Sequence, residues 1–448
     1  MQKFDLNEFN TSSHQEWREK ILVDLKGKSL ESLDKVNNDH LKIRPDYTSE
    51  DAIHHSSAQF ISSNIKNADT KENWWINQYF EGTEHKSLNE KILVALNAGV
   101  DSIGIQIEDD TNFDVLFKDI IPEHIEIRFV NATETQIRSY LKWSQQHQFN
   151  TALFEGTFEV YYNEIKDVSQ RIEIAQLIID HFPKMSMVNI NGAYFFNQGA
   201  TNLQQLGISI AMAHEILAEL IDHNIAPEKA ASLISFTLAT GADFFGEIAK
   251  FRAFKSLWAV ILREYGIQAQ PILVHGVTST WTQTVLDINN NMLRSSTQAL
   301  SAVLGGCQTI TVTPFDASVR PGNDFSERMA RNTQLIIRDE AFAGKVTDIA
   351  SGSYYIEQLT VEVAEKSWAV FLEVEKNKGF LEAFNSGIIA KWIEESRHQY
   401  WEQAASGETT ILGVNKYPNP SENKEALFDE KEKNQINHPS LSEAIKHS

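Results

Sequence analysis

Residues 232–266 have the sequence SLISFTLATGADFFGEIAKFRAFKSLWAVILREYG, which contains one complete strand–turn–helix unit. Its first seven residues form a short apolar run, which is typical of a buried strand. Asp243 stands where it can cap a helix, apolar residues then recur near the helical period, and Gly266 follows the last of them. The unit therefore predicts a strand that is followed at once by a helix.

The same rhythm extends over residues 85–400, where short strand-like runs alternate with helical segments. Eight such runs are present, at 100–107, 125–130, 151–156, 186–190, 232–238, 271–276, 309–315 and 345–351. Eight strands, each with its helix, over about 300 residues match a (β/α)₈ TIM barrel. A doubly wound open sheet is the alternative, but it usually has fewer strands and a glycine-rich phosphate loop after the first, which is missing here. We predict an α/β protein whose main domain, residues 85–400, is a TIM barrel.

Two segments flank this predicted barrel. Residues 1–84 are predicted to form an N-terminal helical extension, with one amphipathic helix signal at 12–27 that Ser13 can cap. The helix must bury its apolar stripe on its own domain or on a partner chain, and the stripe consists of Trp17, Ile21, Leu22 and Leu25. Residues 401–448 are predicted to form an irregular C-terminal tail, because the chain beyond Gly413 is rich in Pro, Asn, Glu and Lys. This composition predicts a tail that is mobile or draped over a surface.

The overall composition excludes several classes of partner. The chain has 61 acidic and 40 basic residues and a formal net charge of −21, so it repels nucleic acid and anionic membranes. Apolar stretches are too short for a membrane helix, and the first ten residues lack the pattern of a signal peptide, so a cytoplasmic location is expected. Cys307, the single cysteine, lies at the start of an apolar run and is expected in the core.

The active site of a TIM barrel lies at the carboxyl ends of its strands, so these ends are the candidate site. They predict an acidic rim with one histidine, made of Glu108, Asp109, Asp110, Asn131, Glu155, residues 191–194 and 239–243, His275, Gly276, residues 313–316 and residues 351–353. The carboxylates could supply an acid–base pair or a hard-cation site, or could cap helices, as Asp243 and Asp316 can. His275 could act as a base, or could be a hydrogen-bonded structural residue. Signatures of nucleophilic, zinc and nucleotide chemistry are absent from the sequence.

Several long stretches resemble one family. LATGADFFGEIAKFRAFKSLWAVI, RSSTQALSAVLGGCQTITVTPFD, NDFSERMARNTQLIIRDE, SGSYYIEQLT and ILGVNKY are similar to the acyl-CoA mutase barrel of the methylmalonyl-CoA mutase family. EWREKILVDLKG and IRPDYTSEDA near the N-terminus make the small subunits of the bacterial two-chain members the most similar. The resemblance implies that in catalytic relatives the CoA chain lies along the barrel axis and the barrel faces a cobalamin-binding domain. Adenosylcobalamin there supplies the radical that interconverts methylmalonyl-CoA and succinyl-CoA.

The resemblance also assigns eight positions of this chain to the family's site, and most of them are changed. An arginine is replaced by Asn77, although Tyr79 is kept, and a glutamine is replaced by Phe154. Ala193 and Tyr194 stand for a tyrosine–histidine pair after the strand at 186–190. The remaining positions carry Leu273 for an arginine, a retained His275, and Leu286 for a glutamine.

These changes remove the cations that a carboxylate and CoA phosphates require. We also expect bulky side chains to fill the axial channel, namely Phe154, Tyr194, Phe195 and Phe196. The Asp-x-His-x-x-Gly signature of the cobalamin ligand is absent, and only 35 residues follow Gly413, so no cobalamin-binding domain is expected.

The resemblance therefore predicts a non-catalytic small subunit that is inactive alone. It binds no cofactor itself and pairs with a methylmalonyl-CoA mutase large subunit that holds adenosylcobalamin. Two alternatives stay open: a stand-alone ligand-binding or regulatory barrel, and an enzyme whose altered chemistry uses Tyr79, Tyr194, His275 and the acidic rim.

Overall fold

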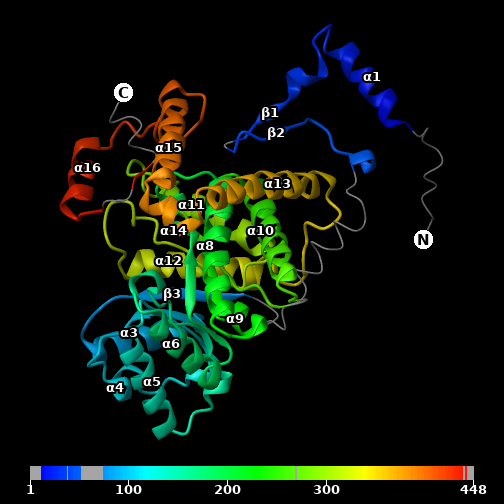
Figure 1. The fold of residues 1–448 in the computed structure, drawn as a ribbon. Coiled ribbons are helices and arrows are strands. Elements are labelled where there is room, and N and C mark those ends of the chain that lie inside the picture. The colour runs from blue at the N-terminus through cyan, green and yellow to red at the C-terminus, as the bar shows by residue number, and fades with distance from the viewer. Residues whose placement is uncertain (1–11, 38, 52–73, 268–269, 437–438, 441–448) are drawn as a thin grey trace, which may run out of the picture.

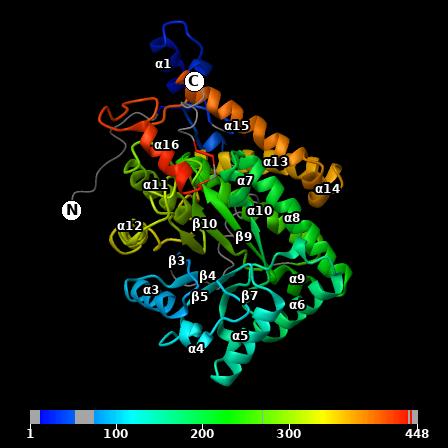
Figure 2. The same ribbon diagram turned by 90° about the vertical axis from the view of Figure 1, so that its left-hand side faces the viewer.

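The computed structural model describes residues 12–37, 39–51, 74–267, 270–436 and 439–440. Its centre is a parallel sheet that curls into a barrel with helices around it (Figures 1 and 2). The strands follow the order β7-β6-β5-β4-β3-β11-β10-β9-β8. Their bounds are β3 Trp75–Phe80, β4 Ser102–Gln106, β5 Glu126–Val130, β6 Glu155–Thr157, β7 Met185–Ser186, β8 Val188–Asn191, β9 Ile234–Thr240, β10 Val274–Thr278 and β11 Thr309–Thr311.

β7 and β8 together fill one strand position of the barrel. β7 pairs with β6, while β8, which begins after Met187, pairs with β9. The backbone N–H groups of Met187 and Val188 both donate to the carbonyl of Leu233, at 2.8 and 2.9 Å. The chain thus joins the two ends of the sheet at Met187, which gives eight strand positions and confirms the predicted (β/α)₈ barrel.

Two predicted strands require correction. The first barrel strand is β3, which lies in the range predicted as the extension and pairs with β11 through Asn77 and Thr311. Residues 345–351 form turns instead of a strand. Within them, Asp348 has a positive φ of 49° and forms a buried ion pair of 2.9 Å with Arg252 of helix α10, so this segment is tied to a helix and not to the sheet. The strand position before Ala193 is consequently the fifth, not the fourth.

Helices cover the outside of the barrel. α10, Phe244–Glu264, is buried along most of its length because it lies between the sheet, α8 and α13. The predicted cap is confirmed, since the Asp243 carboxylate accepts from Gly246 N at 3.2 Å. The other helices of the body are α3 His85–Asn97, α4 Phe113–Leu116, α5 Glu134–Gln146, α6 Val168–His181, α7 Gly192–Asn197, α8 Asn202–Asp222, α9 Pro227–Ser232, α11 Asn290–Leu304, α12 Asp324–Leu335, α13 Tyr354–Lys376, α14 Phe380–Asn385, α15 Ile388–Ser406 and α16 Lys424–Lys433.

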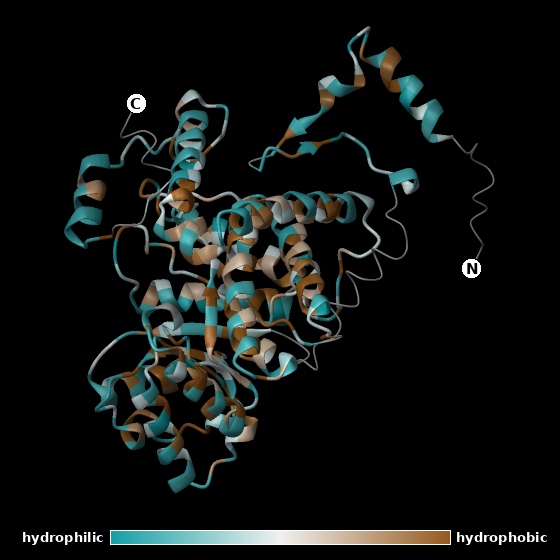
Figure 3. Cartoon of the chain, in the orientation of Figure 1, coloured by the Kyte–Doolittle hydropathy of each residue, from teal (hydrophilic) through white to brown (hydrophobic). Residues whose placement is uncertain are grey.

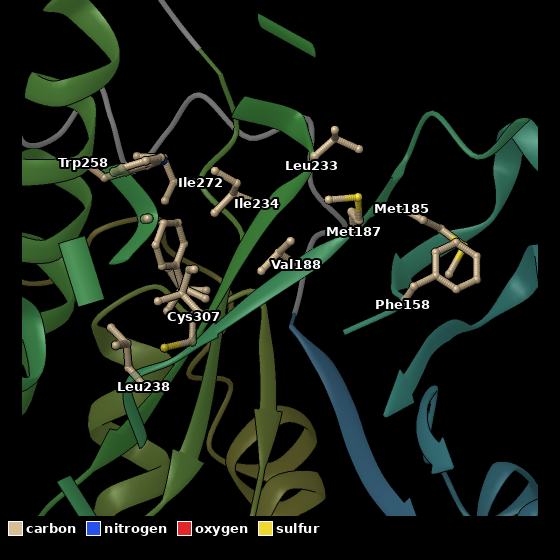
Figure 4. Packing of buried hydrophobic residues seen from close by; sticks show 14 of the residues in the cluster. Phe158, Met185, Met187, Val188, Leu233, Ile234, Leu238, Trp258, Ile272 and Cys307 are labelled. Carbon is tan, nitrogen blue, oxygen red and sulfur yellow. The ribbon is translucent and has the colours of Figure 1, made fainter. Parts of the chain in front are cut away.

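Hydrophobic side chains form two separate clusters. The large cluster fills the space between strands and helices, and Figure 4 shows part of it around Met185, Met187 and Val188. Cys307 belongs to it and is 6% exposed, as expected for a core cysteine. The mouth cluster lies beyond the carboxyl ends of the strands and consists of Ala193, Phe196, Ala239, Trp281, Leu286, Ala404, Ile411 and Val414.

The described N-terminal residues form an arm that stands away from the barrel (Figure 1). It contains α1 His14–Asp24 and a two-stranded antiparallel ribbon of β1 Lys35–Val36 and β2 Lys42–Ile43. Ser13 caps α1 in a capping box, as predicted. No residue of α1 is buried, and the predicted stripe is open, with Trp17 41% exposed. Figure 3 shows brown hydrophobic positions on α1, which lies apart from the barrel.

The described part of the C-terminal tail is draped over the barrel mouth. Asn434 donates to the carbonyl of Val319 at 3.1 Å, and Ser440 donates to the carbonyl of Gln283 at 2.8 Å. Part of the tail, predicted as irregular, is the helix α16, because Asn423 caps it and accepts from the N–H of Ala426. Among the described residues, no helix is both long and apolar enough to cross a membrane.

Candidate functional site

Polar side chains fill the interior of the barrel. In β5, Ile127 and Phe129 point to the helices and join the main core, whereas Glu126 and Arg128 point inward. The inward direction is clear because Arg128 reaches Thr237 on the opposite strand β9. We call the connected interior residues the bore network: Asn77, Ser102, Glu126, Arg128, Glu159, Asn189, Thr237, His275, Thr309 and Thr311.

One side of the bore network is a chain of short hydrogen bonds across β3, β4, β5 and β11. Asn77 donates to Ser102 at 2.7 Å, and Ser102 donates to Glu126 at 2.5 Å. Thr309 donates to the same carboxylate at 2.9 Å, and Thr311 donates to Asn77 at 2.7 Å. Asn77 thus donates through its side-chain NH₂ group and accepts through its side-chain carbonyl within the network.

The other side is centred on Arg128. Its guanidinium forms a 2.8 Å hydrogen bond with Glu159 and lies 3.7 Å from Glu126. Thr237 connects this group to His275, whose Nδ1 lies 3.3 Å from the Thr237 hydroxyl. The network therefore includes residues from both halves of the barrel wall.

The hydrogen bonds of His275 assign its tautomer. The hydroxyl of Thr311 gives its proton to Asn77, so the 2.7 Å contact requires His275 Nε2 to be the donor. Burial and the nearby Arg128 lower the pKa of His275 well below its ordinary value, so the ring is neutral near pH 7. Both ring nitrogens lie against threonine hydroxyls, Nε2 at 2.7 Å from Thr311 and Nδ1 at 3.3 Å from Thr237, which favours the structural interpretation of His275 over the general base.

Burial controls the charges around Arg128. It raises the pKa of Glu126 and of Glu159, while Arg128 opposes this rise in both carboxyls. Burial alone would lower the pKa of Arg128, but Glu159, Tyr79 and Glu126 raise it on balance, so the guanidinium stays charged. The one cation of the bore network is therefore committed to carboxylates of the same chain.

Three predicted site residues lie in or beside the bore. Asn77 and His275 belong to the bore network, and both are buried. Tyr79 lies next to it, with its ring centre 6.2 Å from that of His275 and 37% of the residue exposed. Gly104 makes room for this ring, because a Cβ atom there would lie 2.2 Å from it.

The other predicted positions are distributed over the barrel. Leu273 precedes β10 and lines a cavity at the amino ends of the strands. Ala193 and Leu286 are buried in the mouth cluster. Tyr194 on α7 is 54% exposed. The structure therefore does not bring these positions together into one constellation.

The expectation that aromatic side chains fill the axis is wrong. Phe154 packs outside the sheet against Tyr140 of α5, with ring centres 5.6 Å apart. Phe195 packs on Phe380 of α14, and Phe196 belongs to the mouth cluster. Tyr194 is exposed, and hydrogen-bonded polar side chains occupy the bore instead.

The predicted acidic rim also changes. Glu155 begins β6 and lies at the base of the barrel, 3.7 Å from Lys184. His275 is the second residue of β10 and not its end. Residues 351–353 end no strand. Asp316 is buried and pairs with Arg320 at 3.4 Å.

The prediction missed Glu126, Arg128 and Glu159, the charged part of the bore network. The alternation of charged and apolar residues in EIRF, 126–129, was an available signal, since strand side chains point to opposite faces in turn. Within the described part of the chain, no group of three His, Cys, Asp or Glu side chains could hold a metal ion. The hard-cation hypothesis consequently has no support from these residues.

A cavity of about 1,090 Å³ opens at the amino ends of the strands. Trp74 and Leu273 belong to its wall, and Glu126, Arg128 and His275 of the bore network line it as well. The bore network thus borders this basal cavity on the side of the barrel axis.

Comparisons with known proteins agree with this architecture. A family profile described as methylmalonyl-CoA mutase matches residues 145–446. The chain is 32% identical over 443 residues to the methylmalonyl-CoA mutase small subunit of Porphyromonas gingivalis, covering 93% of this chain and 71% of that protein. It is 28% identical over 440 residues to the small subunit of Streptomyces virginiae, covering 92% and 71%. The large subunit of Porphyromonas gingivalis is 34% identical over 261 residues, which are 57% of this chain and 36% of that subunit.

Proposed function

The chain belongs to the methylmalonyl-CoA mutase family, and from this membership we propose that it is the non-catalytic small subunit of a two-chain mutase. Its large subunit would bind adenosylcobalamin and interconvert methylmalonyl-CoA and succinyl-CoA. The small subunit would support that partner without turnover of its own. The bore network is the observation that carries the proposal.

The bore network argues against an acyl-CoA chain along the axis. Such a chain would have to displace buried hydrogen bonds, and each polar group left without a partner costs about 1–3 kcal/mol. It would also find Arg128 already paired with Glu159 at 2.8 Å. The thioester and carboxylate of the substrate therefore gain no free cation in this part of the barrel.

The cofactor fits this chain poorly as well. At two positions that the resemblance assigns to the site, Ala193 and Leu286 pack with Trp281 and with Ile411 and Val414 of the tail region. These side chains are apolar and cannot ligate cobalt. The Asp-x-His-x-x-Gly signature is absent from the 448 residues. We assign adenosylcobalamin, which supplies the radical in catalytic relatives, to the partner.

The arm is the candidate contact with the large subunit. Trp17 and Leu22 of α1 are 41% and 45% exposed, and aromatic anchors of this kind dominate many protein interfaces. Burial of two such side chains in a partner contributes roughly 1.5–3 kcal/mol each. The stripe that the chain itself leaves open would then be buried in the complex.

Reconstitution tests the proposal. The chain, its cognate large subunit and the mixture are assayed for mutase activity with adenosylcobalamin, and the mixture is analysed by size-exclusion chromatography. We expect co-elution and no turnover by the isolated chain; robust turnover by the chain alone would overturn the assignment.

The arm is tested by weakening its stripe. Trp17→Ala with Leu22→Ala should weaken association by at least tenfold, whereas Val94→Ala, at an exposed apolar site on α3, should not. Unchanged affinity of the double variant would exclude the arm as the contact.

The basal cavity supports a second candidate, a stand-alone ligand-binding or regulatory barrel. Its volume of about 1,090 Å³ is enough for a small molecule. Calorimetric binding of a CoA ester to a chain that stays monomeric beside the large subunit would favour this candidate.

A further inference from the structure

The joint between the arm and the barrel contains an unusual concentration of buried charge. Asp39, in the turn between β1 and β2, is only 5% exposed although it lies on the arm. Both of its oxygens accept hydrogen bonds from Asn202 at the start of α8, at 2.8 Å from the backbone N–H and 3.0 Å from the side chain. This turn is therefore the place where the arm is fastened to the body.

Other contacts fix the same joint. Asn37 donates to Asp243, the cap of α10, at 3.0 Å. Leu41 is fully buried in the main hydrophobic cluster. Tyr47 packs on Tyr355 of α13 with ring centres 4.9 Å apart. The arm thus has a defined docked position, in which Asp39 is brought into the body of the protein.

In that position Asp39 meets two further carboxyl groups. Asn202 also donates to Glu247 at 3.1 Å, so one amide bridges Asp39 and Glu247. Lys250 is the buried cation of the cluster; it forms an ion pair with Glu247 and donates to Asn202 at 3.0 Å. Asp39, Asp243 and Glu247 border the same small cavity, and Lys250 is paired with Glu247, so ionisation of all three carboxyl groups leaves excess negative charge at the joint.

A cavity of about 50 Å³ borders the cluster and is large enough for water. His40 of the same turn and Tyr400 of α15 also line it, together with Asp39, Asp243 and Glu247. A proton can therefore reach Asp39 through this space without disassembly of the joint.

We propose that Asp39 is a proton-sensitive latch, which fastens the arm to the barrel when it carries a proton and loosens the joint when it loses it. Burial, and then the charge of Asp243, raise the pKa of Asp39 from 3.8 to about 7 in the docked state; Glu247 adds to this rise, and the hydrogen bonds from Asn202 oppose it. In an undocked arm Asp39 is solvated and returns to its ordinary pKa. Docking is accordingly coupled to proton uptake.

The sign of the effect follows from linkage. Because the docked pKa is raised, the stabilisation is complete below the ordinary pKa and is lost as the pH rises toward about 7. The docked-to-undocked ratio should fall by roughly 15-fold between pH 5.5 and pH 7, and level off above about pH 8. An arm that carries a partner contact would then be released near neutral pH.

The distance between two spin labels tests the latch in the isolated full chain, with no large subunit present. Val36→Cys on β1 and Leu372→Cys on α13 supply exposed sites, while Cys307 is buried and stays unlabelled. A label at β1 reports on the joint and not on α1. We expect a single narrow distance at pH 5.5 and a growing broad component as the pH rises.

Substitutions separate the latch from general pH effects. Asp39→Asn, which stays neutral, should remove the pH dependence, whereas Asp24→Asn at an exposed carboxylate of α1 should leave it unchanged. Asp243→Asn keeps a helix cap but removes one facing charge, so it should keep the arm docked to higher pH. A distance that does not change from pH 5.5 to 8, or an Asp39→Asn chain that responds like the wild type, overturns the proposal.

Discussion

Replacement of Arg128 by methionine should destabilise the protein by about 3–5 kcal/mol at pH 7, because it leaves buried carboxyl groups without their cation. Arg128 is 3% exposed and forms a 2.8 Å ion pair with Glu159. Glu126 keeps hydrogen bonds from Ser102 and Thr309, so Glu159 suffers most.

The size of the effect can be worked from protonation. A carboxyl group with an ordinary pKa of 4.5 is neutralised at pH 7 at a cost of about 3.4 kcal/mol, and at pH 5.5 at a cost of about 1.4 kcal/mol. Without the cation, the folded chain holds Glu159 protonated, with a pKa raised above that of the unfolded chain. Its stability is therefore greatest at low pH and is lost as the pH rises. The deficit of Arg128→Met should shrink by about 2 kcal/mol between pH 7 and pH 5.5.

Urea unfolding followed by tryptophan fluorescence at both pH values measures this deficit. A second change, Glu159→Gln, should restore most of the stability at pH 7, because it removes the uncompensated charge. Arg138→Met is the matched control: this exposed arginine pairs with Glu134 on the surface of α5, and its loss should cost less than about 1 kcal/mol. A deficit of Arg128→Met below about 1 kcal/mol, or one that is equal at both pH values, would refute the reasoning.

Three further predictions follow from local contacts. Gly104→Ala places a Cβ atom 2.2 Å from the ring of Tyr79, so it should lower the free energy of unfolding by about 1–3 kcal/mol, and urea unfolding at wild-type stability would contradict this. Trp281→Ala removes a large side chain, only 3% exposed, from the mouth cluster on which the C-terminal tail packs. The tail should become at least tenfold more sensitive to limited proteolysis, while the barrel stays folded. Hydrogen bonds to Asp46 and then to a second carboxylate raise the pKa of His14 above 6.5, so this contact of the arm is lost as the pH rises through the raised value. An NMR titration should show a raised pKa for His14, and this pKa should fall in the Asp46→Asn variant. A His14 pKa that is the same in both proteins would argue against the contact.

The main architecture was predictable because its signals are local. Strands such as β9 and β4 are buried along most or all of their length, and their apolar residues form runs that are visible in the sequence. Asp243 and Ser13 cap their helices through side chains only a few residues away. Signals of this kind depend on neighbours along the chain, so the (β/α)₈ pattern could be recognised from them.

The first strand and the bore network were not predictable in the same way. β3 contains Asn77 and Gln78, so it lacks an apolar run, although the amide of Asn77 is satisfied inside the barrel. The side-chain carbonyl of Asn77 accepts a hydrogen bond from Thr311, which lies 234 residues further along the chain. The run at 345–351 shows the opposite error, since it contains β-branched residues but has no strand to pair with. Pairing across such separations is decided by the closed barrel and not by local composition.

The pairing of β3 with β11 also determines when the barrel can close during synthesis. One edge of β3 is covered only when β11 pairs with it, Thr309 opposite Trp75. A growing chain therefore carries an open strand edge until almost the whole barrel has been made. Contacts of such long sequence separation form slowly, and exposed edges recruit other chains. Fragments that end before residue 309 should therefore aggregate, and slower translation before β11 should lengthen the period in which chaperones are needed.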